Sequence, residues 1–163
     1  MLRKTKKAQL KTSRKLRGYS LIEMAVVVII FGLLFGMIRP AYIYYLDKAK
    51  SEDVMDELVE IEVGIDEFFD NNGYYPDSLD EVFSPVPVDP WGNPYQYLKI
   101  DGGDINGQGQ KRKDKNLVPI NSDYDLYSSG PDGQSVPPLT ANASQDDIVR
   151  GRNGDFIGYA SDY

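Results

Sequence analysis

The sequence predicts an α+β fold in which one long N-terminal helix packs on a small antiparallel sheet with long loops. Three observations support this prediction. A continuous apolar run occupies residues 25–38, a periodic apolar pattern follows at residues 54–68, and short strand-like segments at residues 95–100 and 124–128 alternate with stretches rich in Gly, Pro and Asn. With 163 residues and a hydrophobic share of 41%, the chain has enough material for one compact domain besides the apolar run.

The charges are distributed unevenly along the chain. Residues 1–18 contain eight Lys or Arg and no acid, so the remaining ten basic residues stand against all 25 Asp and Glu and leave that part with a net charge of −15. Phosphate binding needs clustered Lys and Arg, and the acidic body therefore argues against nucleic acid as a partner. The basic segment, in contrast, is typical of the cytoplasmic flank of a membrane-inserted helix.

The chain contains neither cysteine nor histidine. An exported domain with this sequence has no disulfide to stabilise it. It also lacks the commonest general base, the usual zinc ligand and every Ser–His or Cys–His pair. We therefore predict that the protein is not an enzyme. The alternative is a membrane-anchored periplasmic enzyme or binding module, for which the sequence offers no compact catalytic constellation.

Residues 19–38 form the first predicted part of the helix. Twenty residues at about 1.5 Å each span roughly 30 Å, the thickness of a bilayer core. No Ala-x-Ala cleavage site follows Ile38, so the segment is predicted to be retained. A carboxylate in hydrocarbon, such as that of Glu23, is costly unless a cation meets it. Either Glu23 has a cationic partner, or it reaches the headgroups or interacts with the N-terminus of its own helix.

Residues 17–24 (RGYSLIEM), with the apolar run behind them, resemble the class III signal of type IV pilins and type II secretion pseudopilins. The resemblance implies that a prepilin peptidase of the inner membrane cuts between Gly18 and Tyr19 and that the new amine of Tyr19 is methylated. Tyr19 stands where the family usually has Phe or Met. The resemblance also implies that Glu23 meets the N-terminal amine of a neighbouring subunit during filament assembly.

The same resemblance implies three domains in a type IV pilin-like fold. These are a basic cytoplasmic leader at residues 1–18, which is removed, a transmembrane and assembly helix at residues 19–40, and a periplasmic globular domain at residues 41–163. Pro40 falls where many members carry a proline that loosens the helix in filaments, and a proline in a helix interior lacks an N–H and clashes with the preceding turn.

The second part of the helix is predicted from apolar residues that recur every three or four positions, namely Val54, Leu58, Ile61, Ile65 and Phe68. Acidic residues occupy the other faces, so the helix is amphipathic. A two-helix coiled coil is the rival interpretation, although barely three heptads are present. Residues 71–73 (NNG) supply a stop signal, and the mature helix is predicted to run from Tyr19 to about Asn71, with a kink at Pro40.

The remaining chain reads as turns, short elements and loops. A short helix is predicted after residue 77, with Asp77 as its N-cap, and residues 89–94 (DPWGNP) as a turn. Between the two strands, residues 101–121 form a loop of roughly twenty residues. Its basic run is Lys111, Arg112, Lys113 and Lys115. This run either meets the acidic helix of a neighbouring subunit or is a solvated loop tip.

Residues 74–76, 89–95, 125–133 and 146–148 together resemble the major pseudopilins of type II secretion. The resemblance implies a calcium site in the final loop, with Asp132 and one or both of Asp146 and Asp147 as ligands. Calcium takes about six to eight oxygen ligands and accepts backbone carbonyls, which suits an irregular loop. The alternative is that these acids are turn and capping residues on a surface loop.

The resemblance predicts a structural subunit of a type II secretion pseudopilus, assembled from the bacterial inner membrane to help push folded proteins through the outer-membrane secretin. The implied partners are further copies in a helical filament, the prepilin peptidase, minor pseudopilins, the inner-membrane assembly platform and membrane lipid. The alternative is a major or minor pilin of a type IV pilus. Residues 149–159 depart from the usual major pseudopilin, either as an extra edge strand or as the mark of a relative that serves another filament.

Overall fold

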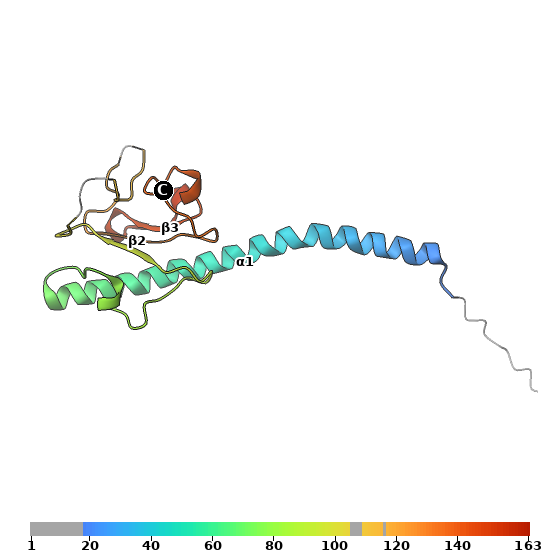
Figure 1. Ribbon diagram of the computed structural model, residues 1–163, viewed down its shortest axis with the longest axis horizontal. Helices are drawn as coiled ribbons and strands as arrows, with labels where there is room; N and C mark the ends of the chain where they lie inside the picture. Colours follow the sequence, from blue (N-terminus) through green and yellow to red (C-terminus); the bar gives the residue numbers. More distant parts are fainter. Residues whose placement is uncertain (1–17, 105–108, 116) are drawn as a thin grey trace, which may run out of the picture. The chain divides into compact units, whose positions relative to one another are not determined.

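The computed structural model describes residues 18–104, 109–115 and 117–163 (Figure 1). Apart from Gly18, the predicted leader lies outside the described residues. The helices and strands follow one another as α1 (Leu21–Asn72), η1 (Leu79–Glu81), β1 (Gln96–Lys99), β2 (Tyr124–Ser128), η2 (Asn142–Ser144), β3 (Ile148–Gly151), η3 (Arg152–Gly154), β4 (Phe156–Tyr159) and η4 (Ala160–Asp162). The chain divides into two compact units, with the boundary between Tyr42 and Ile43.

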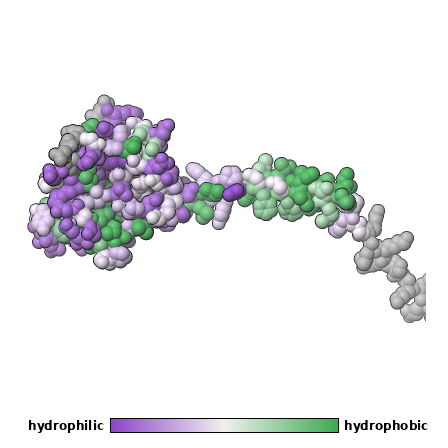
Figure 2. All heavy atoms as spheres, viewed as in Figure 1, coloured by the Kyte–Doolittle hydropathy of each residue, from purple (hydrophilic) through white to green (hydrophobic). Residues whose placement is uncertain are grey.

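The described part of the first unit is mainly the N-terminal part of α1, and most of its side chains are apolar and exposed. Figure 2 shows these residues in green, in contrast to the largely purple globular unit. An 18-residue window of α1 reaches a mean hydropathy of 2.7, and none of it is buried within the protein. By length and composition, this helix can cross a membrane. The helix continues through Pro40.

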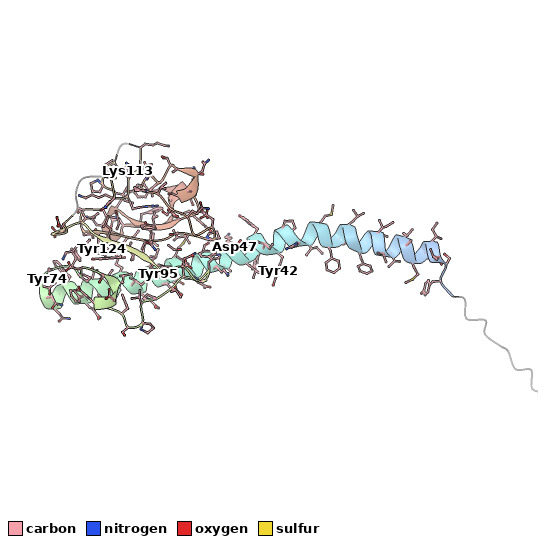
Figure 3. The ribbon with its side chains drawn as sticks, in the orientation of Figure 1. Tyr42, Asp47, Tyr74, Tyr95, Lys113 and Tyr124 are labelled. Atoms are coloured by element: carbon pink, nitrogen blue, oxygen red, sulfur yellow. The ribbon has the colours of Figure 1, made fainter. Side chains whose placement is uncertain are left out.

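The second unit has its main core between α1 and the sheet. Four residues of the predicted stripe, Val54, Leu58, Ile61 and Ile65, are between 0% and 3% exposed, which confirms the amphipathic helix. The fifth, Phe68, is half-buried. The four buried residues share one cluster with buried residues of the sheet and its loops, including Tyr95 and Tyr124, both labelled in Figure 3. Because the sheet covers the stripe, the coiled-coil interpretation is wrong.

The sheet has four antiparallel strands in the order β1-β2-β3-β4. β2 has the predicted bounds, and β1 is two residues shorter than predicted. Neighbouring strand residues point to opposite faces, so Ile148 joins the core against α1, while Val149 joins a second cluster on the other face. β1 and β4 are the two edge strands, so residues 149–159 contain an edge strand, as one of the two interpretations predicted.

The end of α1 follows the predicted stop signal. The helix ends at Asn72, and Gly73 adopts a left-handed conformation with φ of 78° and donates to the Phe69 carbonyl at 2.7 Å. The predicted N-cap at Asp77 is wrong, because Ser78 precedes the short helix η1 and its side chain makes no capping bond. The carboxylate of Asp77 instead accepts a hydrogen bond from Lys99 Nζ at 2.8 Å.

The turn at residues 89–94 is fixed by the buried carboxylate of Asp89. Its Oδ1 accepts from the backbone N–H groups of Trp91 and Asn93, and its Oδ2 accepts from the Ser128 hydroxyl on β2 at 2.6 Å. The indole N–H of Trp91 reaches Asp47 on α1 at 3.3 Å. The turn thus connects the helix to the sheet and supports the loop that follows β2.

Candidate functional site

The N-terminus of α1 is held by a capping box formed by Ser20 and Glu23. The Glu23 N–H donates to the Ser20 hydroxyl oxygen at 3.2 Å, and the Ser20 N–H donates to Glu23 Oε2 at 2.7 Å. This reciprocal pair satisfies donors that a helix start otherwise leaves without partners. In the structure, Glu23 therefore interacts with the N-terminus of its own helix, which is one of the interpretations given for this residue. The S-x-x-E spacing of residues 20–23 is the local sequence signal for this cap.

The predicted cleavage point lies directly before this cap. Gly18, Tyr19 and Ser20 precede the first helical residue and are exposed. A Cβ atom built at Gly18 meets nothing within 4 Å, so the fold does not require glycine at this position. Tyr19 is 84% exposed. A requirement for glycine at residue 18, such as the predicted recognition by the prepilin peptidase, therefore does not come from packing within this chain.

Asp132 and Asp146 lie close together in the loop that follows β2. Gly130 has a φ of 65°, and a Cβ atom there would come within 2.5 Å of the Asp146 carbonyl oxygen, which shows how tightly the loop packs on this residue. Burial raises the pKa of the Asp146 carboxyl, and the charge of Asp132 adds to that rise. Asp132 also accepts from the Gln134 N–H at 2.7 Å, a typical turn contact.

Asp147 differs from its neighbour because it lies inside the protein. Its side chain is fully buried, and its Oδ2 accepts from Arg112 Nη2 at 2.5 Å and from the Ser135 hydroxyl at 2.6 Å. Oδ2 of Asp147 is therefore engaged by partners from its own chain. Within residues 18–104, 109–115 and 117–163, no three acidic side chains gather as a metal-binding group. Calcium binding by the loop stays a prediction.

The basic run of the loop at residues 101–121 is not one solvated cluster. Arg112 is only 2% exposed, whereas Lys115 is exposed and Lys111 and Lys113 are half-buried. Figure 3 shows Lys113 on the side of the globular unit away from α1. Interpretation of the whole run as a loop tip or as a contact for a neighbour is wrong for Arg112, because its guanidinium has partners inside its own chain.

Sequence reasoning also missed Arg150 on β3. Its guanidinium donates to Glu62 of α1 at 2.8 Å and to Asp123 at 2.7 Å, and it stacks over the Tyr124 ring at 4.1 Å. Glu62 is one of the acidic residues that the sequence places on the faces of the helix outside the apolar stripe. No local sequence signal distinguishes Glu62 from its acidic neighbours, since its partner lies 88 positions away.

Comparison with known proteins adds two findings. Residues 13–38, which include Gly18, Tyr19 and Glu23, match the family described as the prokaryotic N-terminal methylation motif. Three curated relatives carry the name type II secretion system core protein G. They come from Pseudomonas aeruginosa (30% identity over 142 residues, 74% of this chain and 87% of the relative), Klebsiella pneumoniae (30% over 136 residues, 81% and 91%) and Escherichia coli strain K12 (26% over 146 residues, 77% and 88%). No solved structure matches the chain significantly.

Proposed function

The chain belongs to the family of type II secretion system core protein G, and on this premise we propose that it is a non-enzymatic structural subunit of a secretion pseudopilus. Copies of the subunit assemble from the bacterial inner membrane into a helical filament that helps to push folded proteins through the outer-membrane secretin. The observation that carries the proposal is the methylation motif placed on an exposed apolar helix that begins directly after the cleavage point. The names of the relatives favour secretion over a type IV pilus.

The proposed topology has the basic leader in the cytoplasm, the N-terminal part of α1 (up to residue 40) across the inner membrane and the globular unit in the periplasm. The prepilin peptidase removes residues 1–18, and Tyr19 becomes the methylated N-terminus. Minor pseudopilins and the inner-membrane assembly platform are the remaining partners. The acidic globular unit and the absence of histidine and cysteine support a role without nucleic acid and without catalysis.

Processing is tested by substitution of Gly18. Because a Cβ atom at this position meets nothing within 4 Å, Gly18→Ala and bulkier variants such as Gly18→Val leave the fold intact, and any loss reflects the peptidase. We expect the leader to remain attached in Gly18→Val, with the uncleaved mass of the whole chain. Gly36→Ala is the matched control. Gly36 lies within α1, and a Cβ atom there also meets nothing within 4 Å, so this variant is expected to be processed normally. Intact-mass measurement that shows normal cleavage of Gly18→Val contradicts the assigned cleavage point.

Assembly is tested at Glu23 with variants that separate its charge from its capping bond. Glu23→Gln keeps a side-chain oxygen for the Ser20 N–H, because Gln also serves in capping boxes, but removes the negative charge. We expect Glu23→Gln and Glu23→Ala to remain membrane-inserted and to be absent from filaments, since the proposed partner is the cationic amine of a neighbouring subunit.

The control for this experiment is Ser20→Ala, which removes the hydroxyl that caps the Glu23 N–H and leaves the carboxylate in place. Filament yield of Ser20→Ala is expected to stay close to that of the unmodified chain. Normal filament yield from Glu23→Gln contradicts the charge-based role. Equal loss from Ser20→Ala and Glu23→Gln shows instead that the cap is what assembly requires.

A further inference from the structure

We propose that tyrosine side chains anchor both ends of the apolar helix in the lipid headgroup regions and thereby fix the depth of α1 in the bilayer. The anchor on the N-terminal side is Tyr19. The anchor on the other side is a group of three residues that we call the tyrosine collar, namely Tyr42, Tyr44 and Tyr45. The inference rests on the membrane topology of the proposed function and names the residues that contact the headgroups.

The tyrosine collar lies on a turn of α1 that is exposed on every side. Tyr42 is 61% exposed, Tyr44 74% and Tyr45 72%, and Ile43 between them is 47% exposed. Four consecutive residues cover the whole circumference of a helix, because one turn takes about 3.6 residues. The later turns, which carry the stripe that begins at Val54, differ because one of their sides is buried in the core. A surrounding medium such as lipid accounts for apolar exposure on every side, whereas a single packed partner would account for one side only.

The distance between the two anchors matches the thickness of a bilayer. Tyr42 lies 21 positions after Leu21, the first residue of α1, and Tyr45 lies 24 positions after it. At a rise of about 1.5 Å per residue, these separations are about 32 Å and about 36 Å. The hydrocarbon core is about 30 Å thick, and the bilayer with its headgroups is about 40–45 Å thick. Tyr19 precedes Leu21 by two residues, so the tyrosines reach just beyond the hydrocarbon at both ends of the helix.

Tyrosine is suited to these positions because its side chain is amphipathic. The ring is apolar, and the hydroxyl both donates and accepts hydrogen bonds. Tyr and Trp are accordingly enriched at both membrane–water interfaces, where the ring meets the acyl chains and the polar group meets headgroups and water. Between the anchors, residues 24–38 carry only apolar side chains and glycine. The tyrosines therefore lie where aromatic residues are expected at each interface.

The charges at the ends of the apolar run explain why the depth of the helix has to be fixed. The 15 residues at positions 24–38, between Glu23 and Arg39, are uncharged and span about 22 Å, which is less than the core of about 30 Å. A shift of the helix toward either side draws Glu23 or Arg39 deeper into the hydrocarbon, where a charged side chain is costly. Tyrosines at both ends oppose the shift in either direction, because it would carry a hydroxyl into the core. They thereby keep the Glu23 carboxylate close to the headgroups, where its proposed cationic partner lies.

The test measures the depth of single tryptophans in the full-length chain, reconstituted in phosphatidylethanolamine–phosphatidylglycerol vesicles. The vesicles contain lipids that are spin-labelled either on the headgroup or near the end of the acyl chain. Trp91 is the one native tryptophan, so a Trp91→Phe background leaves only the introduced fluorophore. Tyr44→Trp places it in the tyrosine collar, and Ile30→Trp, midway between the anchors, is the matched control. We expect the headgroup label to quench Tyr44→Trp at least about twofold more than the acyl-chain label, and the reverse order for Ile30→Trp.

The anchoring role is tested by replacement of all three tyrosines of the collar with Leu, which keeps an apolar side chain and removes the hydroxyl. The reporter is Leu34→Trp, which lies on the collar side of the helix centre. We expect the helix to move into the bilayer, so that quenching of this reporter by the acyl-chain label rises about 1.5-fold. Tyr74→Leu is the matched control, because Tyr74 is also exposed but lies beyond the end of α1, and it is expected to leave the quenching unchanged.

The outcomes separate this inference from the proposed function. If neither label quenches Ile30→Trp, the helix does not lie in the bilayer, and the topology fails together with the anchors. If Ile30→Trp behaves as expected and Tyr44→Trp is quenched by neither label, the topology stands and the tyrosine collar does not contact lipid. Protection of Tyr44→Trp that grows with the protein-to-lipid ratio shows that a second copy covers the collar and likewise overturns the inference. Equal quenching of Leu34→Trp with and without the collar tyrosines contradicts their role in fixing the depth.

Discussion

Two buried arginines, Arg112 and Arg150, connect segments that are distant in the sequence. Arg150 is 3% exposed and pairs with Glu62 of α1 and with Asp123, which lies directly before β2. A guanidinium can serve both acids at once because it presents several donors in one plane, which a lysine cannot do. The pairing ties the C-terminal half of α1 to the sheet beside Tyr124, a residue of the main core.

We predict that Arg150→Gln destabilises the globular unit by about 2–4 kcal/mol, because Glu62 and Asp123 lose their cation in a largely buried site. Urea unfolding measures the loss. Arg152→Gln is the control, since Arg152 is exposed, and is expected to cost at most about 0.5 kcal/mol. A free energy of unfolding for Arg150→Gln that matches the Arg152→Gln value refutes the structural role of the pair.

The residues that sequence reasoning found and those that it missed differ in how local their signal is. The stripe from Val54 to Ile65, which the sequence predicted, depends on neighbours within one or two helical turns. The S-x-x-E cap, which was not predicted, is an equally local signal. Arg112 stands in a loop rich in Gly and Lys, which is typical of a solvated segment, and its partner Asp147 is 35 positions away. Such pairs follow from the tertiary fold, and a single sequence therefore does not predict them.

At the scale of elements, the C-terminal segment of residues 152–163 gives the sheet the edge strand β4 and covers its second face. The cluster on that face contains the buried residues Ile120, Leu139, Val149 and Ala160, with Tyr127, Phe156 and Tyr163 packed around it. Without β4 and the residues after it, the apolar side chains of β3 and of the two long loops would face water. The C-terminal segment is therefore part of the folded unit.

We predict that Ala160→Asp destabilises the globular unit by at least about 3 kcal/mol, because Ala160 is 5% exposed and an acid there buries a charge without a partner. The control is Ser161→Asp, which places the same acid on the next residue, an exposed one, and is expected to change little. Urea unfolding of both variants measures the difference. Equal stability of the two variants means that the second face of the sheet does not contribute to the core.

At the scale of the whole molecule, the two units have opposite chemical character. Figure 2 shows the apolar surface on the N-terminal part of α1, and the globular unit is predominantly hydrophilic on the face shown. The sequence predicted this division because runs of apolar residues and charge imbalance are additive properties that need no tertiary contacts. How the final loop is held in place is the opposite case, since it depends on a few specific contacts.

The last prediction concerns the orientation of the whole chain across the membrane. The eight basic residues of the leader favour the cytoplasmic side, and the net charge of −15 in the remainder does not oppose export, because acids contribute little to orientation. The chain has no cysteine, so single-cysteine variants report position without background. We expect Ser161→Cys to react with a membrane-impermeant maleimide once the outer membrane is permeabilised. Ser13→Cys, in cells without prepilin peptidase, is expected to react only after lysis.

The charge argument is tested in the same cells by replacement of the eight leader Lys and Arg residues with Gln. If these charges set the orientation, labelling of Ser161→Cys in unlysed cells falls, because part of the population inserts the other way or fails to insert. Labelling of Ser13→Cys before lysis in the unmodified background contradicts the proposed topology. Unchanged labelling after removal of all eight charges leaves the topology standing but shows that the apolar helix and the assembly machinery determine it.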